Sequence, residues 1–338
     1  MRQGSARRSL SGWMNLSLTR LVWLGGAIAL IAAGIGLAYF SPPPAPLSAG
    51  NAIDVPLPPA AESRPSLLKP APDPDLVEDS PNGPLPIIGK DGRQPWQVYA
   101  APFDAKDTRP RIALIVTGIG LDQTLSQAAL DRLPGAITFG FDPYADNVKD
   151  NAVNGRRLGH EALLGLPLEP LDYPRQDPGP LTLLTSLDTA QNAERLTKLM
   201  GKATGYVGVV AIMGARFEGE NASLMPLLET LKQRGLMFAD DRAPEKSIVA
   251  PIATQMKLPW AAGNSVIDSE SDPVAIDQAL AGLETSAKRG GAALGIAALS
   301  PALLDRIAAW LPTLDGKGIA LAPASAIANR QSASQPVQ

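Results

Sequence analysis

The sequence predicts an α/β fold in which seven or eight strand–helix units close into a barrel, behind one transmembrane helix and a proline-rich linker. Three observations predict this organisation. Residues 21–40 form an uncharged apolar run, the segment 41–95 holds 15 of the chain's 33 prolines, and short apolar runs alternate with helical patterns from Arg111 onward. Such alternation indicates repeated right-handed units around a parallel sheet. This number of units favours a barrel over two open sheets.

The amino-terminal segment predicts a membrane anchor. Residues 1–20 carry four arginines and no acidic residue, and Leu21–Phe40 follows without a charge. At about 1.5 Å per residue this run spans the roughly 30 Å hydrocarbon core of a bilayer. The arginines place residues 1–20 in the cytoplasm by the positive-inside rule. A cleaved signal peptide is the alternative, but the run is long and no small-x-small cleavage site follows it.

The linker and the ends of the barrel are predicted from composition. Residues 41–91 are rich in proline and lack a sustained apolar period. Because proline removes backbone donors and favours an extended chain, this stretch is predicted to be disordered. It serves either as a spacer or as a docking strip for a partner. Residues 92–328 are predicted to form the barrel, and residues 329–338 a disordered polar tail.

Strands and helices are predicted to alternate along the barrel. The predicted strands are Ile112–Val116, Ala136–Phe141, Ala162–Leu166, Val207–Met213, Leu236–Ala239, Ser265–Ile267, Ala292–Ala297 and Gly318–Leu321. The predicted helices are Leu121–Leu133, Asn147–Leu158, Thr189–Met200, Ala222–Arg234, Ser247–Met256, Asp272–Gly290 and Pro301–Leu311. In such folds the loops that leave the strand carboxyl ends carry ligands and chemistry.

The composition excludes several classes of function. The net charge is −3 and no basic stripe is present, so nucleic acid is not expected as a partner. The chain has no cysteine and one histidine, His160. A metal centre built from two imidazoles and an aspartate is therefore impossible, as is a thiolate site. A Ser-His-Asp triad needs His160 as its base, and no GxSxG elbow is present.

Five segments resemble one known family. They are GRQPWQVYAAPF, RIALIVTGIGL, GHEALLGLPLEP, GYVGVVAIMGARF and AAGNSVIDS, in this order. They resemble the divergent polysaccharide deacetylases (the YibQ-like group), over about Pro95 to Ser325. The resemblance implies a distorted (β/α)7-8 barrel related to the NodB-type carbohydrate deacetylases. It also implies an envelope protein, anchored in the bacterial inner membrane with its barrel in the periplasm.

The resemblance also implies where a catalytic metal would be bound. Active members have an Asp-Asp pair after the first strand, a histidine before LPMEP, a histidine before MGSRF, and a Gly-His-Pro near the last strands. Here these positions are Thr117-Gly118, Gly165, Ile212 and Ala297-Ala298-Leu299. We therefore expect no metal cofactor, neither zinc nor another divalent ion.

The remaining polar residues near strand ends are the candidate site. The candidate ligand-binding residues are Thr117, Glu169, Arg216, Asp240, Arg242 and Asp268. Four of them have a structural alternative: Asp240 could pair with Arg242 or Arg216, and Glu169 could cap backbone amides. An all-oxygen site for Mg²⁺ or Ca²⁺ could be built from Asp240, Asp241, Asp268 and Glu169. His160 and Glu161 could act as an acid/base pair, or serve as structural residues.

Three functions follow from these features. The first is a catalytically degenerate, polysaccharide deacetylase-like module that binds an envelope glycan or an envelope protein. The second is an active carbohydrate deacetylase or hydrolase with a carboxylate-only site, whose candidate catalytic residues are Asp240, Asp241, Asp268 and Glu169. The third is a structural tether in which the linker of residues 41–91 is the working part. The sequence favours the first.

Overall fold

Seven parallel strands close into a barrel in the computed structural model, which describes residues 68–241, 248–268 and 272–331. The strands are β3 (Arg111–Ile119), β4 (Thr138–Phe141), β5 (Ala162–Pro167), β6 (Gly208–Ile212), β7 (Met237–Asp240), β8 (Trp260–Ile267) and β9 (Ala292–Ala298). Each strand pairs with the next along the chain, and β9 pairs back onto β3 over seven register positions. A short strand, β10 (Ala320–Leu321), pairs with the start of β3. The predicted α/β barrel is confirmed, with seven strands in the closed ring.

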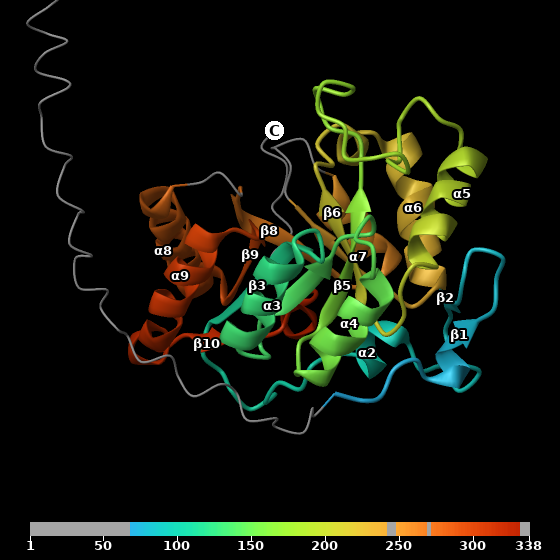
Figure 1. Cartoon of the computed structure of the whole chain (residues 1–338). Coiled ribbons are helices and arrows are strands. Elements are labelled where there is room, and N and C mark those ends of the chain that lie inside the picture. Colours follow the sequence, from blue (N-terminus) through green and yellow to red (C-terminus); the bar gives the residue numbers. More distant parts are fainter. Residues whose placement is uncertain (1–67, 242–247, 269–271, 332–338) are drawn as a thin grey trace, which may run out of the picture. The chain divides into compact units, whose positions relative to one another are not determined.

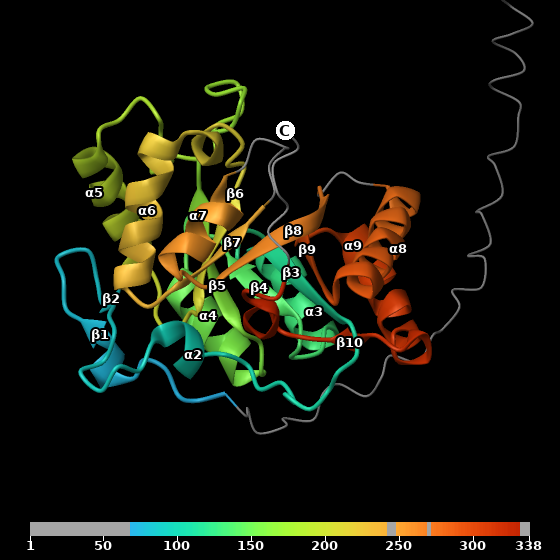
Figure 2. The same cartoon turned by 180° about the vertical axis from the view of Figure 1, so that it is seen from behind.

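Helices alternate with the strands and surround the barrel (Figures 1 and 2). They are α3 (Gln123–Arg132), α4 (Val148–Arg157), α5 (Thr189–Met200), α6 (Asn221–Gln233), α7 (Val249–Met256), α8 (Pro273–Gly290) and α9 (Pro301–Trp310). A short helix, α2 (Pro95–Val98), precedes β3. The predicted strands and helices are all present, with small differences at their ends. The largest difference is in β8, which begins at Trp260 instead of Ser265.

Both faces of β3 are buried, as its apolar run predicts for a parallel strand. Ile112 and Leu114 belong to the layer between the strands and the helices. Their neighbours Ala113 and Ile115 belong to a second cluster, which fills the barrel and includes Tyr99 from the segment before β3. This alternation places Thr117 in line with Ala113 and Ile115, on the barrel's inner face at its carboxyl end.

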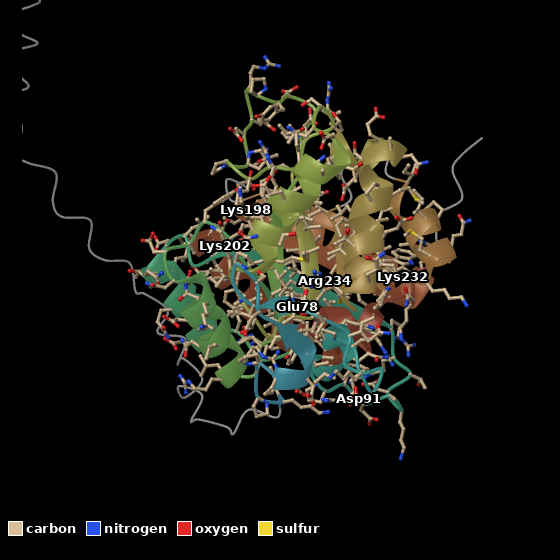
Figure 3. All side chains as sticks on the ribbon, turned by 90° about the vertical axis from the view of Figure 1, so that its right-hand side faces the viewer. Glu78, Asp91, Lys198, Lys202, Lys232 and Arg234 are labelled. Atoms are coloured by element: carbon tan, nitrogen blue, oxygen red, sulfur yellow. The ribbon has the colours of Figure 1, made fainter. Side chains whose placement is uncertain are left out.

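The prediction of a disordered linker is wrong for residues 68–91. Leu76 and Leu85 in this segment are 0% and 3% exposed, and β1 (Val77–Glu78) pairs antiparallel with β2 (Leu85–Pro86). Arg234 holds this hairpin, since its guanidinium lies 2.6 Å from the Glu78 carboxylate and 3.0 Å from the Pro86 carbonyl (Figure 3). The proline-rich composition predicts disorder, and the two buried leucines are isolated in the sequence. No apolar period therefore indicates that they pack on the barrel.

The predicted tail also begins too early. The Asn329 amide donates to the Trp260 carbonyl, and the Asn329 side chain accepts from the Trp260 amide. The Gln331 side chain likewise bonds both backbone groups of Ala262. Asn329 and Gln331 thus bond the first part of β8, before its pairing with β9 begins at Gly263. The carboxyl-terminal segment therefore satisfies backbone hydrogen-bonding groups of β8 that β9 does not reach.

The predicted cytoplasmic tail, transmembrane helix and first part of the linker lie in residues 1–67, outside the described residues. Among the helices that the structure describes, none is long and apolar enough to cross a membrane.

Candidate functional site

The carboxyl ends of the seven strands form the mouth of the barrel, below the long loop between β5 and α5 (Figure 1). Large apolar side chains are exposed there: Leu121, Leu171, Met213 and Val266 are 50–62% exposed and follow or end strands β3, β5, β6 and β8. Met213 also has a positive φ of 61°. Strained backbone at a non-glycine residue is frequent at functional sites. The mouth is therefore partly apolar and accessible.

The four positions at which the resemblance implies a metal lie at or near the carboxyl ends of β3, β5, β6 and β9, at this mouth. Thr117 of β3 is in register with Ala298 of β9. A Cβ built on Gly165 would lie 3.6 Å from a side-chain carbon of Ile212. The Thr117 hydroxyl, which donates to the Ala297 carbonyl at 3.4 Å, is the one oxygen that these side chains offer. Zinc needs nitrogen, sulfur or carboxylate ligands, so this donor set does not fit it.

Glu169 is a structural anchor of the mouth. Its carboxylate accepts hydrogen bonds from the Thr185 amide at 2.5 Å and the Thr185 hydroxyl at 2.7 Å. Its backbone carbonyl accepts from the amides of Arg216 and Phe217. The Arg216 guanidinium lies 3.7 Å from the Glu169 carboxylate and is about half exposed. The structure thus shows Glu169 capping a backbone amide, and it gives Arg216 this carboxylate as an ion-pair partner.

A carboxylate cluster lies where β6 and β7 end. One oxygen each from Glu218, Asp240 and Asp241 lies within 4.8 Å of the others. Glu218 is 0% exposed, Asp240 is 2% exposed and Asp241 is partly buried. Burial, and then repulsion from Asp240 and Asp241, raises the pKa of the Glu218 carboxyl well above its ordinary value. The structure therefore brings the Glu218 carboxyl beside those of Asp240 and Asp241.

Glu218 was missed because no strand pattern points to it. It lies in a short 3-10 helix, Phe217–Gly219, between β6 and α6. Asp268, in contrast, is exposed at the end of β8 and is not part of this carboxylate cluster. The expected four-carboxylate site of Asp240, Asp241, Asp268 and Glu169 is therefore wrong in two of its members. Arg242 lies outside the described residues.

His160 and Glu161 lie at the start of β5, at the opposite end of the barrel from the mouth. The His160 ring stacks on Phe139 with centroids 4.0 Å apart, and its Nδ1 lies 3.0 Å from the Ile137 carbonyl. Burial lowers the pKa of this imidazole. Glu161 belongs to a separate hydrogen-bond network with Ala101, Thr138 and Ser325. The two side chains have different partners, and both have structural contacts.

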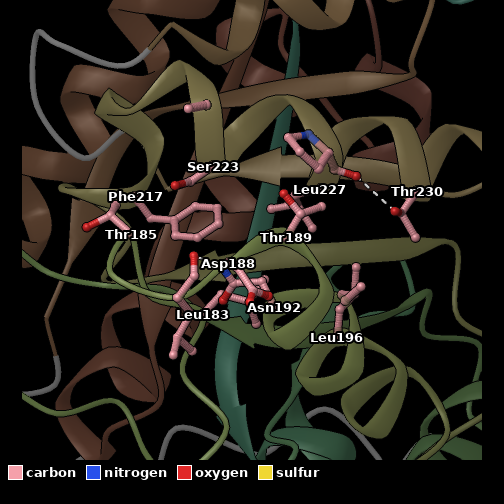
Figure 4. A pocket seen from close by; sticks show the side chains of 14 residues that line it. Leu183, Thr185, Asp188, Thr189, Asn192, Leu196, Phe217, Ser223, Leu227 and Thr230 are labelled. Carbon is pink, nitrogen blue, oxygen red and sulfur yellow. Dashed lines mark hydrogen bonds between the residues drawn. The ribbon is translucent and has the colours of Figure 1, made fainter.

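A groove of about 280 Å³ opens beside the mouth, between α5 and α6 (Figure 4). Its floor includes Phe217, and its edges carry the hydroxyls of Thr185, Thr189 and Ser223. Thr185 is also the partner of Glu169. The groove therefore continues from the pair formed by Glu169 and Arg216.

Comparison with known proteins gives a consistent result. The model of a family described as divergent polysaccharide deacetylase matches residues 114–328. A crystal structure of the uncharacterized protein ATU2773 from Agrobacterium tumefaciens C58 is 36% identical with a TM-score of 0.70, covering 72% of this chain and 99% of that chain. No match was found among curated proteins.

Proposed function

Because the chain belongs to the divergent polysaccharide deacetylase family, we propose that it binds an envelope glycan without deacetylating it. The observation that carries this proposal is the donor set at the mouth. The positions of the family's metal ligands hold Thr117, Gly165, Ile212 and Ala298. These four positions offer no carboxylate or imidazole ligand, so they cannot hold the metal that would polarise an acetyl carbonyl and activate water. In the proposed arrangement the anchor of residues 21–40 holds the barrel at the periplasmic face of the inner membrane.

The mouth and the groove offer the groups that recognise a sugar. Arg216 presents a half-exposed guanidinium, and the groove adds hydroxyls of Thr185 and Ser223 above the buried ring of Phe217. Guanidinium and hydroxyl groups bond sugar hydroxyls and acetamido oxygens, and exposed apolar side chains at the mouth, such as Met213, offer contacts for the sugar's carbon face. An envelope protein as the partner is the alternative outcome of the binding test.

We expect the Arg216→Ala variant of the full chain to bind N-acetylated oligosaccharides about tenfold more weakly, because a hydrogen bond to a charged group contributes roughly 1.5 kcal/mol. Calorimetric titration measures this change. The matched control is Arg289→Ala, an exposed arginine in the last turn of α8 at the other end of the barrel. Equal affinity in wild type, Arg216→Ala and Arg289→Ala would place the glycan elsewhere.

The carboxylate cluster supports a second candidate, a hydrolase that uses carboxylates alone. Asp240 and Asp241 share a partly buried site at the end of β7. The Glu218 carboxyl beside them, whose pKa burial raises, can act as a general acid, and an ionised carboxylate next to it as a general base. This function predicts acetate release that disappears in Asp240→Asn, whereas the first predicts binding alone.

A further inference from the structure

The cluster of Glu218, Asp240 and Asp241 brings three carboxyl groups together in a poorly solvated place. Glu218 comes from the segment between β6 and α6, while Asp240 ends β7 and Asp241 follows it. Neither carboxylate oxygen of Glu218 reaches solvent or accepts a hydrogen bond from an amide, hydroxyl or basic side chain among the described residues. A buried carboxylate without a partner is strongly unfavourable, so it needs a proton or a cation.

The backbone around the cluster is fitted to these carboxylates. The Gly214 amide donates to the Asp241 carboxylate at 3.2 Å, and the Glu218 amide donates to the Gly214 carbonyl at 2.9 Å. A Cβ on Gly214 would lie 2.9 Å from both the Cδ and an oxygen of Glu218. Glycine at this position therefore leaves room for the Glu218 carboxyl to turn toward the aspartates.

The dimensions of the cluster fit an oxygen-bound cation. Oxygen ligands lie about 2.3–2.6 Å from Ca²⁺ and about 2.0–2.1 Å from Mg²⁺, so two oxygens that bind the same ion lie no more than roughly 5.2 Å apart. The three carboxylate oxygens lie within 4.8 Å of one another. We propose that Glu218, Asp240 and Asp241 bind one hard divalent cation, and that Ca²⁺ is preferred because Mg²⁺ usually keeps several waters and is rarely held by several protein carboxylates. This cation joins the β6–α6 segment to the end of β7, beside Arg216.

This site differs from the family's metal site in position and in ligands. It uses carboxylates from Glu218, Asp240 and Asp241, whereas the positions at Thr117, Gly165, Ile212 and Ala298 have lost their ligands. Carboxylate-only sites favour Ca²⁺ and Mg²⁺ over zinc. The inference does not depend on glycan binding, since the site forms without a glycan.

The test uses the full chain after a chelator has removed bound ions. Its Tm is measured by thermal unfolding while CaCl₂ or MgCl₂ is added, and isothermal titration calorimetry gives the number of ions bound per chain. We expect one Ca²⁺ per chain and a Tm increase of about 5 °C or more at a hundred times the dissociation constant. Weaker stabilisation by Mg²⁺ supports the preference. No binding of either ion at millimolar concentration overturns the proposal.

Matched variants locate the site. Glu218→Gln is expected to lose the Ca²⁺-dependent Tm shift, while Glu220→Gln, the same change at an exposed residue two positions away, keeps it. Gly214→Ala retains all three carboxylates but displaces Glu218, so its Ca²⁺ affinity should fall at least tenfold. In chelator, Glu218→Gln should unfold at or above the wild-type Tm, because it removes a buried carboxyl. The proposal is overturned if the Ca²⁺-dependent Tm shift persists in Glu218→Gln. It is also overturned if Ca²⁺ does not change the Tm of the wild type while Arg242→Ala lowers that Tm.

Discussion

Replacing Glu161 by alanine is expected to lower the free energy of unfolding by about 3–5 kcal/mol. The carboxylate is 0% exposed and accepts from the Ala101 amide at 3.1 Å, the Ser325 amide at 3.0 Å and the Thr138 hydroxyl at 3.2 Å. The Ser325 hydroxyl is a fourth donor. Each buried donor left unpaired costs roughly 1–3 kcal/mol. Chemical denaturation of the variant measures the loss.

The same residue predicts a pH dependence. Burial raises the pKa of the Glu161 carboxyl above its ordinary value of 4.5. The unfolded carboxyl then loses its proton at a lower pH than the folded one, so this residue's contribution to stability is complete below about pH 4.5 and declines as pH rises. Glu161→Gln should lack this decline.

The control for Glu161→Ala is Glu229→Ala, at an exposed residue on α6, which should change the free energy of unfolding by less than about 0.5 kcal/mol. If Glu161→Ala lowers the free energy of unfolding no more than Glu229→Ala does, the hydrogen-bond network around Glu161 contributes nothing to stability.

Deleting residues 1–91 is expected to destabilise the barrel strongly, whereas deleting residues 1–67 is not. The longer deletion removes Leu76 and Leu85, which are 0% and 3% exposed. It also removes the Lys69 carbonyl, which accepts from the buried Arg156 guanidinium at 2.8 Å. Losing two buried leucines costs about 4 kcal/mol or more. For a domain of this size that corresponds to a Tm decrease of roughly 10 °C.

Scanning calorimetry of fragments 68–338 and 92–338 measures this difference directly. Gly201→Ala in the longer fragment offers a finer probe, because a Cβ there would lie 2.0 Å from the Asn82 carbonyl. It should loosen the contact between the hairpin and the end of α5 while leaving the barrel strands intact. Equal Tm values for the two fragments would mean that residues 68–91 are a linker after all.

The sequence predicts the barrel well because the pattern of apolar residues indicates which strand and helix faces are buried. The run from Ile112 to Val116 is apolar at every position, which a strand buried on both faces requires. Helix boundaries follow capping chemistry: Asp188 and Gln191 form a capping box at α5, and Ser300 caps α9. Segments without a period, such as residues 68–91, are not predicted because isolated leucines carry no pattern.

The site could be predicted only in part. Asp240 and Asp241 lie directly after a predicted strand, so their position at the mouth follows from the fold. Glu218 does not follow from the strand pattern, because the turn after Gly214 brings it back toward β7. Asp268 fails for the opposite reason: it ends a strand, yet its side chain is exposed. The order of the strands predicts which loops lie at the mouth. The conformation of each loop determines which of its side chains point toward the carboxylate cluster.

Acetate release tests the central claim most directly. The full chain is incubated with an N-acetylated oligosaccharide that it binds, with zinc and then with calcium added, and free acetate is measured. Binding without acetate above the level of buffer alone is the result expected for a barrel that recognises a glycan and has lost its metal ligands. Acetate produced over many turnovers, and abolished by Asp240→Asn, would contradict it and assign hydrolysis to the carboxylate cluster.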